Sequence, residues 1–258
     1  MQITLNLRKK LEQTANEYFE KSKKARKKTE GARAIILKFK KELEELERKQ
    51  AAEEKKVEVK KTVPKEWYEK FRWFISSEGF LCIGGRDATT NEVIIKKHTD
   101  KDDIVFHTEA PGSPFFTIKT EGKKPTDITK KEVADATASY SKAWKLGLSA
   151  VEVYEIKPEQ VSKKAPSGEY MSKGAFMITG KRAYHQGTIK LAVGKLPDER
   201  IMGGPETAVK ANCKKYAVVT QGKDKPSDCA KKTAKYLEAD IDNVLRVLPA
   251  GTCKITTQ

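Results

Sequence analysis

Two residues in this sequence have side chains suited to acid–base chemistry and stand just after short apolar runs: Asp87, which follows Arg86, and His107. Asp87 beside Arg86 could act as a general base with its orienting partner, and His107 precedes a turn rich in proline and glycine. Each residue also has a structural interpretation. Arg86 and Asp87 can position a strand-to-helix loop, Arg86 can equally contact a phosphate or a base edge, and His107 can be a hydrogen-bonded structural residue. The sequence therefore favours a structural or ligand-contacting role over catalysis.

Motifs that would mark a known kind of active site are missing from the sequence. It contains no P-loop, no dinucleotide-binding fingerprint, no His-Glu-x-x-His zinc motif and no nucleophile elbow. The four cysteines are isolated and have no histidine at ligand spacing: Cys82, Cys213, Cys229 and Cys253. We expect buried thiols in a reducing, cytoplasmic compartment, and we expect no disulfide, no metal, no cofactor and no enzyme activity.

One basic segment suggests a polyanionic partner. The chain carries a formal charge of +16, and residues 157–195 hold eight Lys or Arg against two acids. The candidate contact residues in this segment are Lys163, Lys164, Ser167, Lys181, Arg182 and Tyr184. The first three belong to a turn whose amides can hold an anion, and the last three combine cations with a ring that can stack on a base. Nucleic acid is the first candidate partner. Composition alone explains the charge equally well as an aid to solubility.

A second basic block lies near the N-terminus. Residues 21–28 hold six cations in eight positions, among them Lys21, Lys24 and Lys28, with no acid between Glu20 and Glu30. Such a block is either a solvated helix face or a set of phosphate contacts, and the sequence supports the two interpretations equally.

The elements that position these residues begin with a long helix from about residue 8 to residue 57. Apolar and small residues are spaced 4, 3, 4, 3 along it without a slip, and the register passes through Gly31 unchanged. A sustained 3.5-residue repeat predicts one continuous helix with a coiled-coil seam. The alternative is a solvated single helix held by Glu–Lys pairs one turn apart. Before it, the alternation of Ile3, Leu5 and Leu7 resembles a strand remnant, which suggests that more of the protein lies upstream.

The rest of the chain has the pattern of an α+β body, a mixed β-sheet with flanking helices. After a linker at residues 60–64, we predict a short helix over Trp67–Ile75, a strand at Phe80–Ile83 and a turn at Gly84–Gly85. Thr89 with Glu92, and Thr129 with Glu132, have the spacing of capping boxes. Further strands are predicted at 104–106, 115–118, 151–156, 175–179, 188–193 and 216–220, a loop at 180–187, and helices at 226–239 and 241–248.

An ordered set of segments resembles the RNA-binding domain of the NFACT family, called NFACT-R. The matching segments are Trp67–Glu92, Asp103–Lys119, Ser139–Trp144, Ala165–Tyr170 and Gly174–Lys181. The resemblance implies three parts: residues 1–61 with the second arm of a coiled coil, an NFACT-R domain at 62–197, and a small C-terminal α/β module at 198–258. It implies a ribosome quality-control factor that binds rRNA, tRNA or both on large ribosomal subunits that still hold peptidyl-tRNA. The family's N-terminal portion, which carries the residues that tail stalled chains, would be a separate or missing part.

Two other functions remain open at this point. An enzyme such as a hydrolase would need Asp87 and His107 to converge in one pocket. An interaction or adhesion protein would use the coiled coil, alone or by self-association, and some family members have been called fibronectin-binding. The sequence has no signal peptide and no apolar run long enough to span a membrane, which favours the RNA-binding function.

Overall fold

The computed structural model describes residues 10–57, 66–109, 112–163 and 173–257, with side chains through residue 48 in the first range. The chain divides into two units, residues 1–62 and 63–258. The predicted strand at Ile3–Leu7 and the linker at residues 60–64 lie outside the described residues. Within the described part, no helix is long and apolar enough to cross a bilayer.

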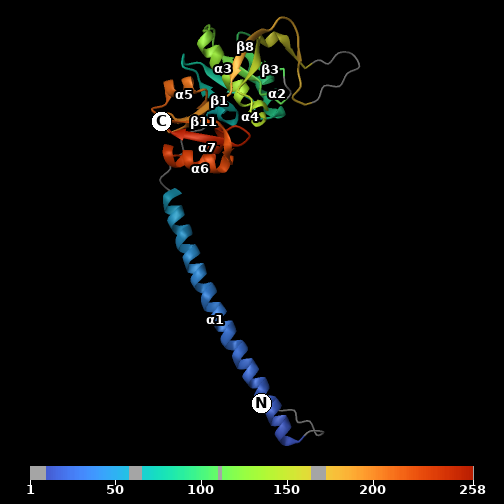
Figure 1. Cartoon of the computed structure of the whole chain (residues 1–258), viewed down its shortest axis with the longest axis vertical. Helices are drawn as coiled ribbons and strands as arrows, with labels where there is room; N and C mark the ends of the chain where they lie inside the picture. The colour runs from blue at the N-terminus through green and yellow to red at the C-terminus, as the bar shows by residue number, and fades with distance from the viewer. Residues whose placement is uncertain (1–9, 58–65, 110–111, 164–172, 258) are drawn as a thin grey trace, which may run out of the picture. The chain divides into compact units, whose positions relative to one another are not determined.

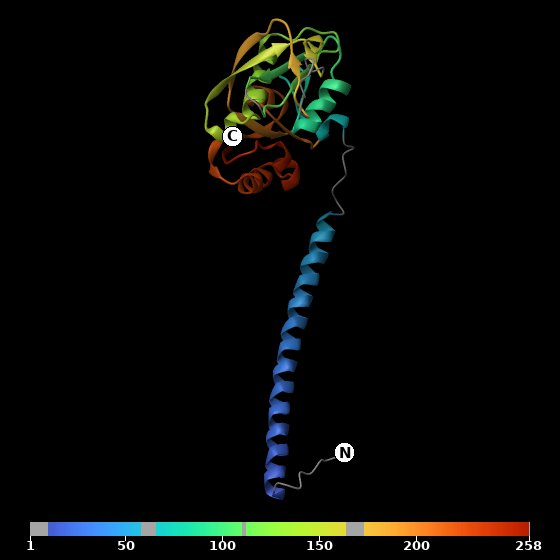
Figure 2. The ribbon, with the colours of Figure 1, turned by 90° about the vertical axis from the view of Figure 1, so that its right-hand side faces the viewer.

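The first unit contains one continuous helix, α1 (Leu11–Val57), which Figures 1 and 2 show without a break. Its 47 residues correspond to roughly 70 Å at 1.5 Å per residue. The helix is rich in Ala, Leu, Glu, Lys and Arg, all good helix formers, and has no proline to interrupt it. Gly31 lies within the helix with open space around it, so the chain does not reverse there. The prediction of one helix is confirmed.

The apolar seam of α1 is uncovered among the described residues. Its exposed members are Leu11, Tyr18, Ile36, Phe39, Leu43 and Leu46. Phe39, for example, is 62% exposed, far more than a seam residue of a formed coiled coil. An apolar stripe of this kind gains stability from a partner that covers it, so the pairing of this helix stays a prediction.

We expect the chain to self-associate through this seam, and Phe39→Glu to weaken the association at least about tenfold because two buried aromatic side chains are lost per dimer. Sedimentation equilibrium over a range of concentrations measures this. Ala34→Glu is the matched control, because it adds the same charge at an exposed position outside the seam. A strict monomer at high concentration would contradict the prediction.

The described residues of the second unit form two larger antiparallel sheets and a small one. The six-stranded sheet has the order β1 (Arg72–Ile75), β2 (Leu81–Gly84), β4 (Phe116–Lys119), β3 (Ile104–Thr108), β5 (Ala150–Ile156), β8 (Ala183–Thr188). The four-stranded sheet has the order β10 (Ile201–Gly204), β9 (Leu191–Lys195), β11 (Lys215–Asp224), β12 (Cys253–Thr257). The small sheet pairs β6 (Val161–Ser162) with β7 (Met177–Ile178). The α+β class is confirmed, with antiparallel rather than mixed pairing, because short connections such as that between β1 and β2 reverse the chain.

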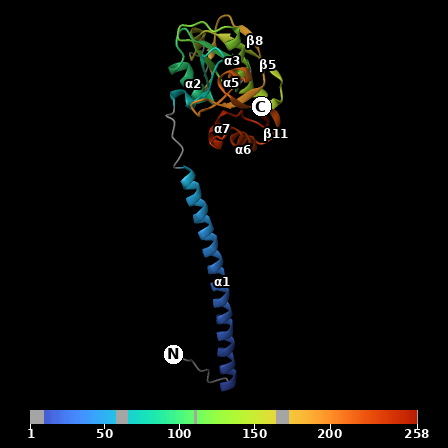
Figure 3. The same ribbon diagram turned by 90° about the vertical axis from the view of Figure 1, so that its left-hand side faces the viewer.

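Helices cover these sheets. In the first part of the unit they are α2 (Ala88–Lys97), α3 (Asp127–Ser139) and α4 (Ala143–Leu146), with short 3-10 turns at Trp67–Lys70 and Pro158–Gln160. Helix α3 packs on the six-stranded sheet. In the C-terminal part they are α5 (Glu206–Asn212), α6 (Pro226–Leu237) and α7 (Ile241–Val247), and α6 and α7 lie side by side in Figures 1 and 3. All four cysteines are buried, as predicted, and their thiols are free.

The predicted helix over Trp67–Ile75 is wrong. Only Trp67–Lys70 forms a helical turn, and the following residues form β1, where Trp73 lies opposite Ile83 and Phe74 opposite Cys82. The spacing of aromatic residues fits a helix, but both faces of β1 are buried, which removes the alternation of a half-exposed strand. A turn at residues 76–79, where Gly79 has φ +86°, joins β1 to β2.

Both predicted capping boxes are displaced. The N-cap of α2 is Asp87, whose Oδ1 accepts a 2.8 Å hydrogen bond from the backbone N–H of Thr90, so Thr89 lies inside the helix. The N-cap of α3 is Thr126 rather than Thr129. Residues 183–187 of the predicted loop form β8 together with Thr188, because they pair with β5 along its length. Local capping motifs are short and recur by chance, so their position depends on the tertiary pairing.

The two larger sheets share one apolar core. The Ile75 backbone N–H donates to the Met202 sulfur at 3.2 Å, and β9, which precedes the predicted domain boundary at 197/198, pairs with β10 and β11. Residues 63–258 thus form one compact unit. The division of that unit into two domains stays a prediction.

Candidate functional site

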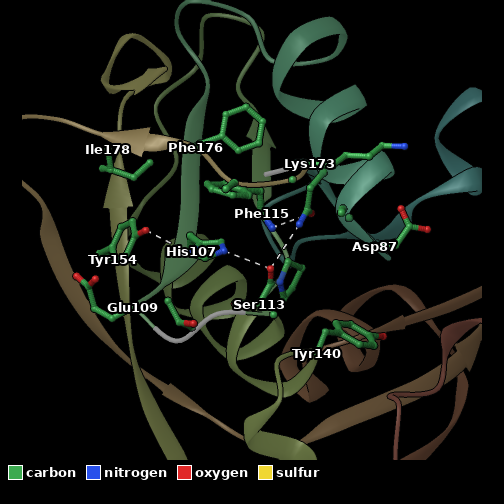
Figure 4. A pocket seen from close by; sticks show the side chains of 18 of the residues that line it. Asp87, His107, Glu109, Ser113, Phe115, Tyr140, Tyr154, Lys173, Phe176 and Ile178 are labelled. Atoms are coloured by element: carbon green, nitrogen blue, oxygen red, sulfur yellow. Dashed lines mark hydrogen bonds between the residues drawn. The ribbon is translucent and has the colours of Figure 1, made fainter. Parts of the chain in front are cut away.

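A pocket of about 670 Å³ lies among the N-terminal end of α2, strands β3 and β5, and residues 173–178 (Figure 4). Two glycines bring these parts close together. A Cβ at Gly85 would overlap the side chain of Asn91, and a Cβ at Gly174 would overlap Ala88 at the start of α2. Gly174 also has φ +81°, which side chains other than glycine rarely adopt. The pocket therefore depends on close backbone approach at both positions.

A row of aromatic rings follows the wall of the pocket. His107 stacks on Phe115 at 4.0 Å between ring centroids, and Phe115 meets Phe176 edge-on at 5.2 Å. On the other side, His107 lies 5.9 Å from Tyr154, which in turn meets Tyr184 edge-on at 6.3 Å. Such distances are those of favourable aromatic pairs. The row therefore forms a set of mutually supported rings along one wall. Phe115 and Tyr154 within it are buried, and the rings at its two ends, Phe176 and Tyr184, are the more exposed ones.

A cation covers a ring near each end of this row. The Arg182 guanidinium lies 4.8 Å from the Tyr154 ring, and the Lys163 ammonium lies 5.1 Å from the Phe176 ring. Positive charge held over aromatic faces is attracted to them and suits recognition of bases and phosphates together. The predicted contacts Lys163, Arg182 and Tyr184 are thus brought to one aromatic surface.

Carboxylates hold these cations in place. Glu109 pairs with Arg182 and also accepts a 3.4 Å hydrogen bond from the Tyr184 hydroxyl. Glu92 lies 2.6 Å from the Lys163 ammonium and accepts from the Gly174 N–H at 2.9 Å. The hydrogen bond from Lys163, followed by that from Gly174, lowers the pKa of Glu92 to about 2, so this carboxylate is ionised at neutral pH.

His107 is occupied by structural hydrogen bonds. Its Nε2 lies 3.2 Å from the Ser113 carbonyl oxygen, and its Nδ1 lies 3.2 Å from the Tyr154 hydroxyl. Burial lowers the pKa of His107 to about 4 and raises that of Tyr154 to about 12, so both are neutral at physiological pH. The neutral ring then donates to Ser113 through Nε2 and accepts from Tyr154 at Nδ1. These contacts are those of a structural histidine.

Asp87 lines the same pocket, but it caps α2. Its hydrogen bond from the Thr90 N–H is the largest cause of a lowered pKa, and Figure 4 shows its side chain across the pocket from His107, with Ser113 between them. A hydrolase would need these two groups to act on one reacting atom. Both are instead engaged with neighbouring residues of the fold.

Arg86 also has a structural setting. Its guanidinium donates to three backbone carbonyls: Lys70 at 3.2 Å, Phe71 at 2.9 Å and Arg246 at 2.7 Å. Burial is the main reason why its pKa is lowered. Between the two interpretations that the sequence supports equally, these bonds favour the structural one.

The other predicted contacts lie elsewhere or outside the described residues. Lys181 is exposed, and its carbonyl accepts from Gln160 at 2.8 Å next to Arg182. Lys164 and Ser167 fall in residues that the structure does not describe. The predicted contacts on α1, which belong to the other unit, are all exposed: Lys21, Lys24 and Lys28.

Sequence reasoning missed several residues that line the pocket. Phe115, Phe176 and Glu109 form its rings and rim, and Lys173 extends an ammonium at its edge (Figure 4). Phe115 and Phe176 follow Pro- or Gly-containing turns at the start of strands, where an aromatic residue is usually assigned to the core. The one available signal was the charge of residues 157–195, which include Lys173. No group of three His, Cys, Asp or Glu side chains suited to a metal occurs within the described ranges.

Comparison with known proteins matches residues 70–180 to the NFACT protein RNA binding domain. The chain is 45% identical over 217 residues to the archaeal Rqc2 homolog aRqcH of Methanocaldococcus jannaschii, which covers 79% of this chain and 31% of that protein. It is 43% identical over 121 residues to the human ribosome quality control complex subunit NEMF, which covers 46% of this chain and 11% of that protein. Among solved structures, the C-terminal part of the fibronectin/fibrinogen-binding protein from Streptococcus suis aligns at 18% identity with a TM-score of 0.42, over 60% of this chain and 52% of that one. The chain thus spans a third or less of the length of these curated relatives.

Proposed function

Because this chain belongs to the NFACT family, we propose that it is a non-catalytic RNA-binding module of a ribosome quality-control factor. The observation that carries the proposal is the aromatic row with its cations, which lies largely within the residues matched to the RNA-binding domain. Rings that accept stacked bases and cations that contact phosphates are the two components of single-strand and loop recognition in RNA.

We propose that the RNA is rRNA, tRNA or both, on large ribosomal subunits that still hold peptidyl-tRNA. The name of the human relative assigns it to a ribosome quality control complex, and the excess of cations in residues 157–195 suits a phosphate backbone. The exposed cations of residues 21–28 on α1 offer a second phosphate-contacting surface. An N-terminal NFACT portion would be the remaining partner, consistent with the part of the relatives that this chain does not span.

Co-sedimentation with ribosomal subunits tests this proposal. The chain is expected to sediment with large subunits and to bind more tightly when they hold peptidyl-tRNA. With charged transfer RNA present, it is expected to produce no tail on the stalled chain, since Asp87 and His107 are held by structural bonds. Absence of binding at low salt would overturn the RNA-binding function, and tail growth lost on Asp87→Asn would overturn its non-catalytic character.

Neutralising the predicted contacts should flatten the salt dependence of RNA binding. The variant carries Gln at Lys163, Lys164, Lys181 and Arg182, and the slope of log K against log salt should fall by roughly one for each lost phosphate contact. The matched control carries Gln at four exposed lysines of the C-terminal part: Lys210, Lys214, Lys231 and Lys235. Equal slopes in the variant and the parent would mean that the RNA binds away from these four residues. The next variant to measure would then carry Gln at Lys21, Lys24 and Lys28.

A single substitution should act in the opposite direction. Glu109 forms an ion pair with Arg182, so an RNA phosphate must compete with this carboxylate for the guanidinium. Glu109→Gln is therefore expected to raise affinity and to make the salt slope steeper by up to about one. An unchanged or weaker affinity would mean that Arg182 does not meet phosphate.

A further inference from the structure

We propose that the pocket beside the aromatic row binds a single unpaired nucleotide, with its base inserted against the rings while the RNA strand passes from Arg182 to Lys173. This inference rests on the proposed RNA-binding function and adds the form in which the RNA is recognised: one base extruded from its neighbours. Reading of splayed-out bases against aromatic side chains is a general mode of RNA recognition. Four properties of the pocket support it.

The first property is size. A volume of about 670 Å³ lies within the range of pockets that hold small ligands, and it exceeds the space of a trapped water. A groove that only follows the RNA backbone requires no such depth. The pocket can therefore take a planar ring system together with part of its sugar.

The second property is a small apolar cluster that is separate from the main core. It contains Val105, Phe115, Tyr154 and Ile156, with the half-buried Phe176 and Ile178 packed against it. Figure 4 shows Phe176 and Ile178 on the upper side of the pocket, with Phe115, His107 and Tyr154 below them. The half-exposed Phe176 and Ile178 leave an apolar surface on the pocket against which a flat ligand can lie.

The third property is the placement of positive charge on opposite sides of the pocket. Arg182 lies on the side of Glu109 and Tyr154, whereas the Lys173 ammonium extends on the side of Asp87 in Figure 4. Phosphates on either side of an inserted nucleotide would each meet one of these cations. A single central cation cluster would instead suit a terminal phosphate.

The fourth property concerns the end of α2. A helix N-terminus usually attracts phosphate, but here the cap is the ionised Asp87. A carboxylate repels phosphate and accepts hydrogen bonds from the amino groups of bases. The carboxylate keeps a phosphate off the helix end itself and favours the base edge there, so a phosphate on this side of the pocket would meet the Lys173 ammonium instead.

Abasic scanning of the unmodified chain tests the inference. A short single-stranded RNA of mixed sequence is compared with versions that lack the base at one position in turn, by equilibrium binding to the full chain. If one base is extruded into the pocket, removing that base should lower the RNA affinity about tenfold or more, while removing a base at any other position should have a small effect. Uniform small losses at every position would overturn the single-nucleotide pocket.

Two variants locate that base in the pocket. Phe176→Leu keeps apolar volume and removes the ring, so it should weaken binding of the intact RNA about tenfold and leave binding of the critical abasic RNA unchanged. Lys173→Gln, at an exposed position outside the strands, should lower the salt slope by roughly one. If both variants bind as the parent does, the pocket is not the site, although the RNA-binding function stands. If the unmodified chain binds no RNA at low salt, the proposed function itself fails.

Discussion

Replacing Arg86 with methionine is expected to lower the free energy of unfolding by about 2–4 kcal/mol, because three hydrogen bonds from a charged donor are lost at once. Two of these bonds hold the turn before β1, at Lys70 and Phe71, and the third reaches the end of α7 at Arg246. Methionine keeps most of the side-chain length and apolar contact, so the loss reports the guanidinium rather than a cavity. Urea unfolding followed by circular dichroism measures it.

Arg86→Lys is the control that separates charge from geometry. Lysine keeps the positive charge, but its ammonium does not reproduce the planar fork that reaches three carbonyls. If the role of Arg86 is structural, Arg86→Lys should therefore recover only a small part of the stability that Arg86→Met loses. RNA affinity measured far below the melting temperature should be unchanged in both variants. Full stability combined with weaker, less salt-dependent RNA binding in Arg86→Met would make Arg86 a phosphate contact instead.

The same variant tests how the C-terminal segment is joined to the rest of the second unit. Three successive carbonyls at the end of α7 accept from residues of the earlier part: Arg246 from Arg86, Val247 from Tyr140 at 2.8 Å, and Leu248 from Arg72 at 3.4 Å. Arginines at this position also interact favourably with the helix dipole. These bonds and the shared core explain why residues 63–258 are one compact unit, even though the sequence changes character near residue 198.

Features with a sustained local signal could be predicted from the sequence. Helix α1 follows from a repeat that continues over about ten turns, so no tertiary contact is needed to recognise it. Strands such as β3 and β11 were placed to within a few residues because apolar runs bounded by turns are short and distinct. Helix α6 was placed to within two residues by Pro226 at its start and its apolar periodicity.

The features that could not be predicted from the sequence depend on contacts between distant residues. At Trp67–Ile75, helical spacing of aromatic residues coincided with a strand whose partner, β2, decides its conformation. The aromatic row joins rings from positions 107, 115, 154, 176 and 184, which only the sheet order brings together. The role of Arg86 depends on a carbonyl 160 positions away, which no local pattern indicates.

Acidification should weaken the fold through His107. In the unfolded chain this histidine has its ordinary pKa of 6.5, and burial lowers the pKa to about 4 in the folded protein. The unfolded state therefore binds a proton first as the pH falls, and stability that is complete above pH 6.5 is lost progressively down to about pH 4. A difference of this size corresponds to roughly 3 kcal/mol, since each pKa unit is worth about 1.4 kcal/mol.

His107→Gln isolates this contribution from that of the carboxylates. Glu92, for example, has its pKa lowered from 4.5 to about 2, so the stability that it contributes is lost as the pH falls below about 4.5. Glutamine stays neutral and can still donate to the Ser113 carbonyl and accept from the Tyr154 hydroxyl. The parent chain is expected to be the more stable at pH 7, because its ring stacks on Phe115. That advantage should shrink by roughly 3 kcal/mol between pH 7 and pH 4, when urea unfolding of the two proteins is compared. Parallel stability profiles, or a nuclear magnetic resonance titration of His107 near pH 6.5, would show that the ring is solvated and that the aromatic row is open at its centre.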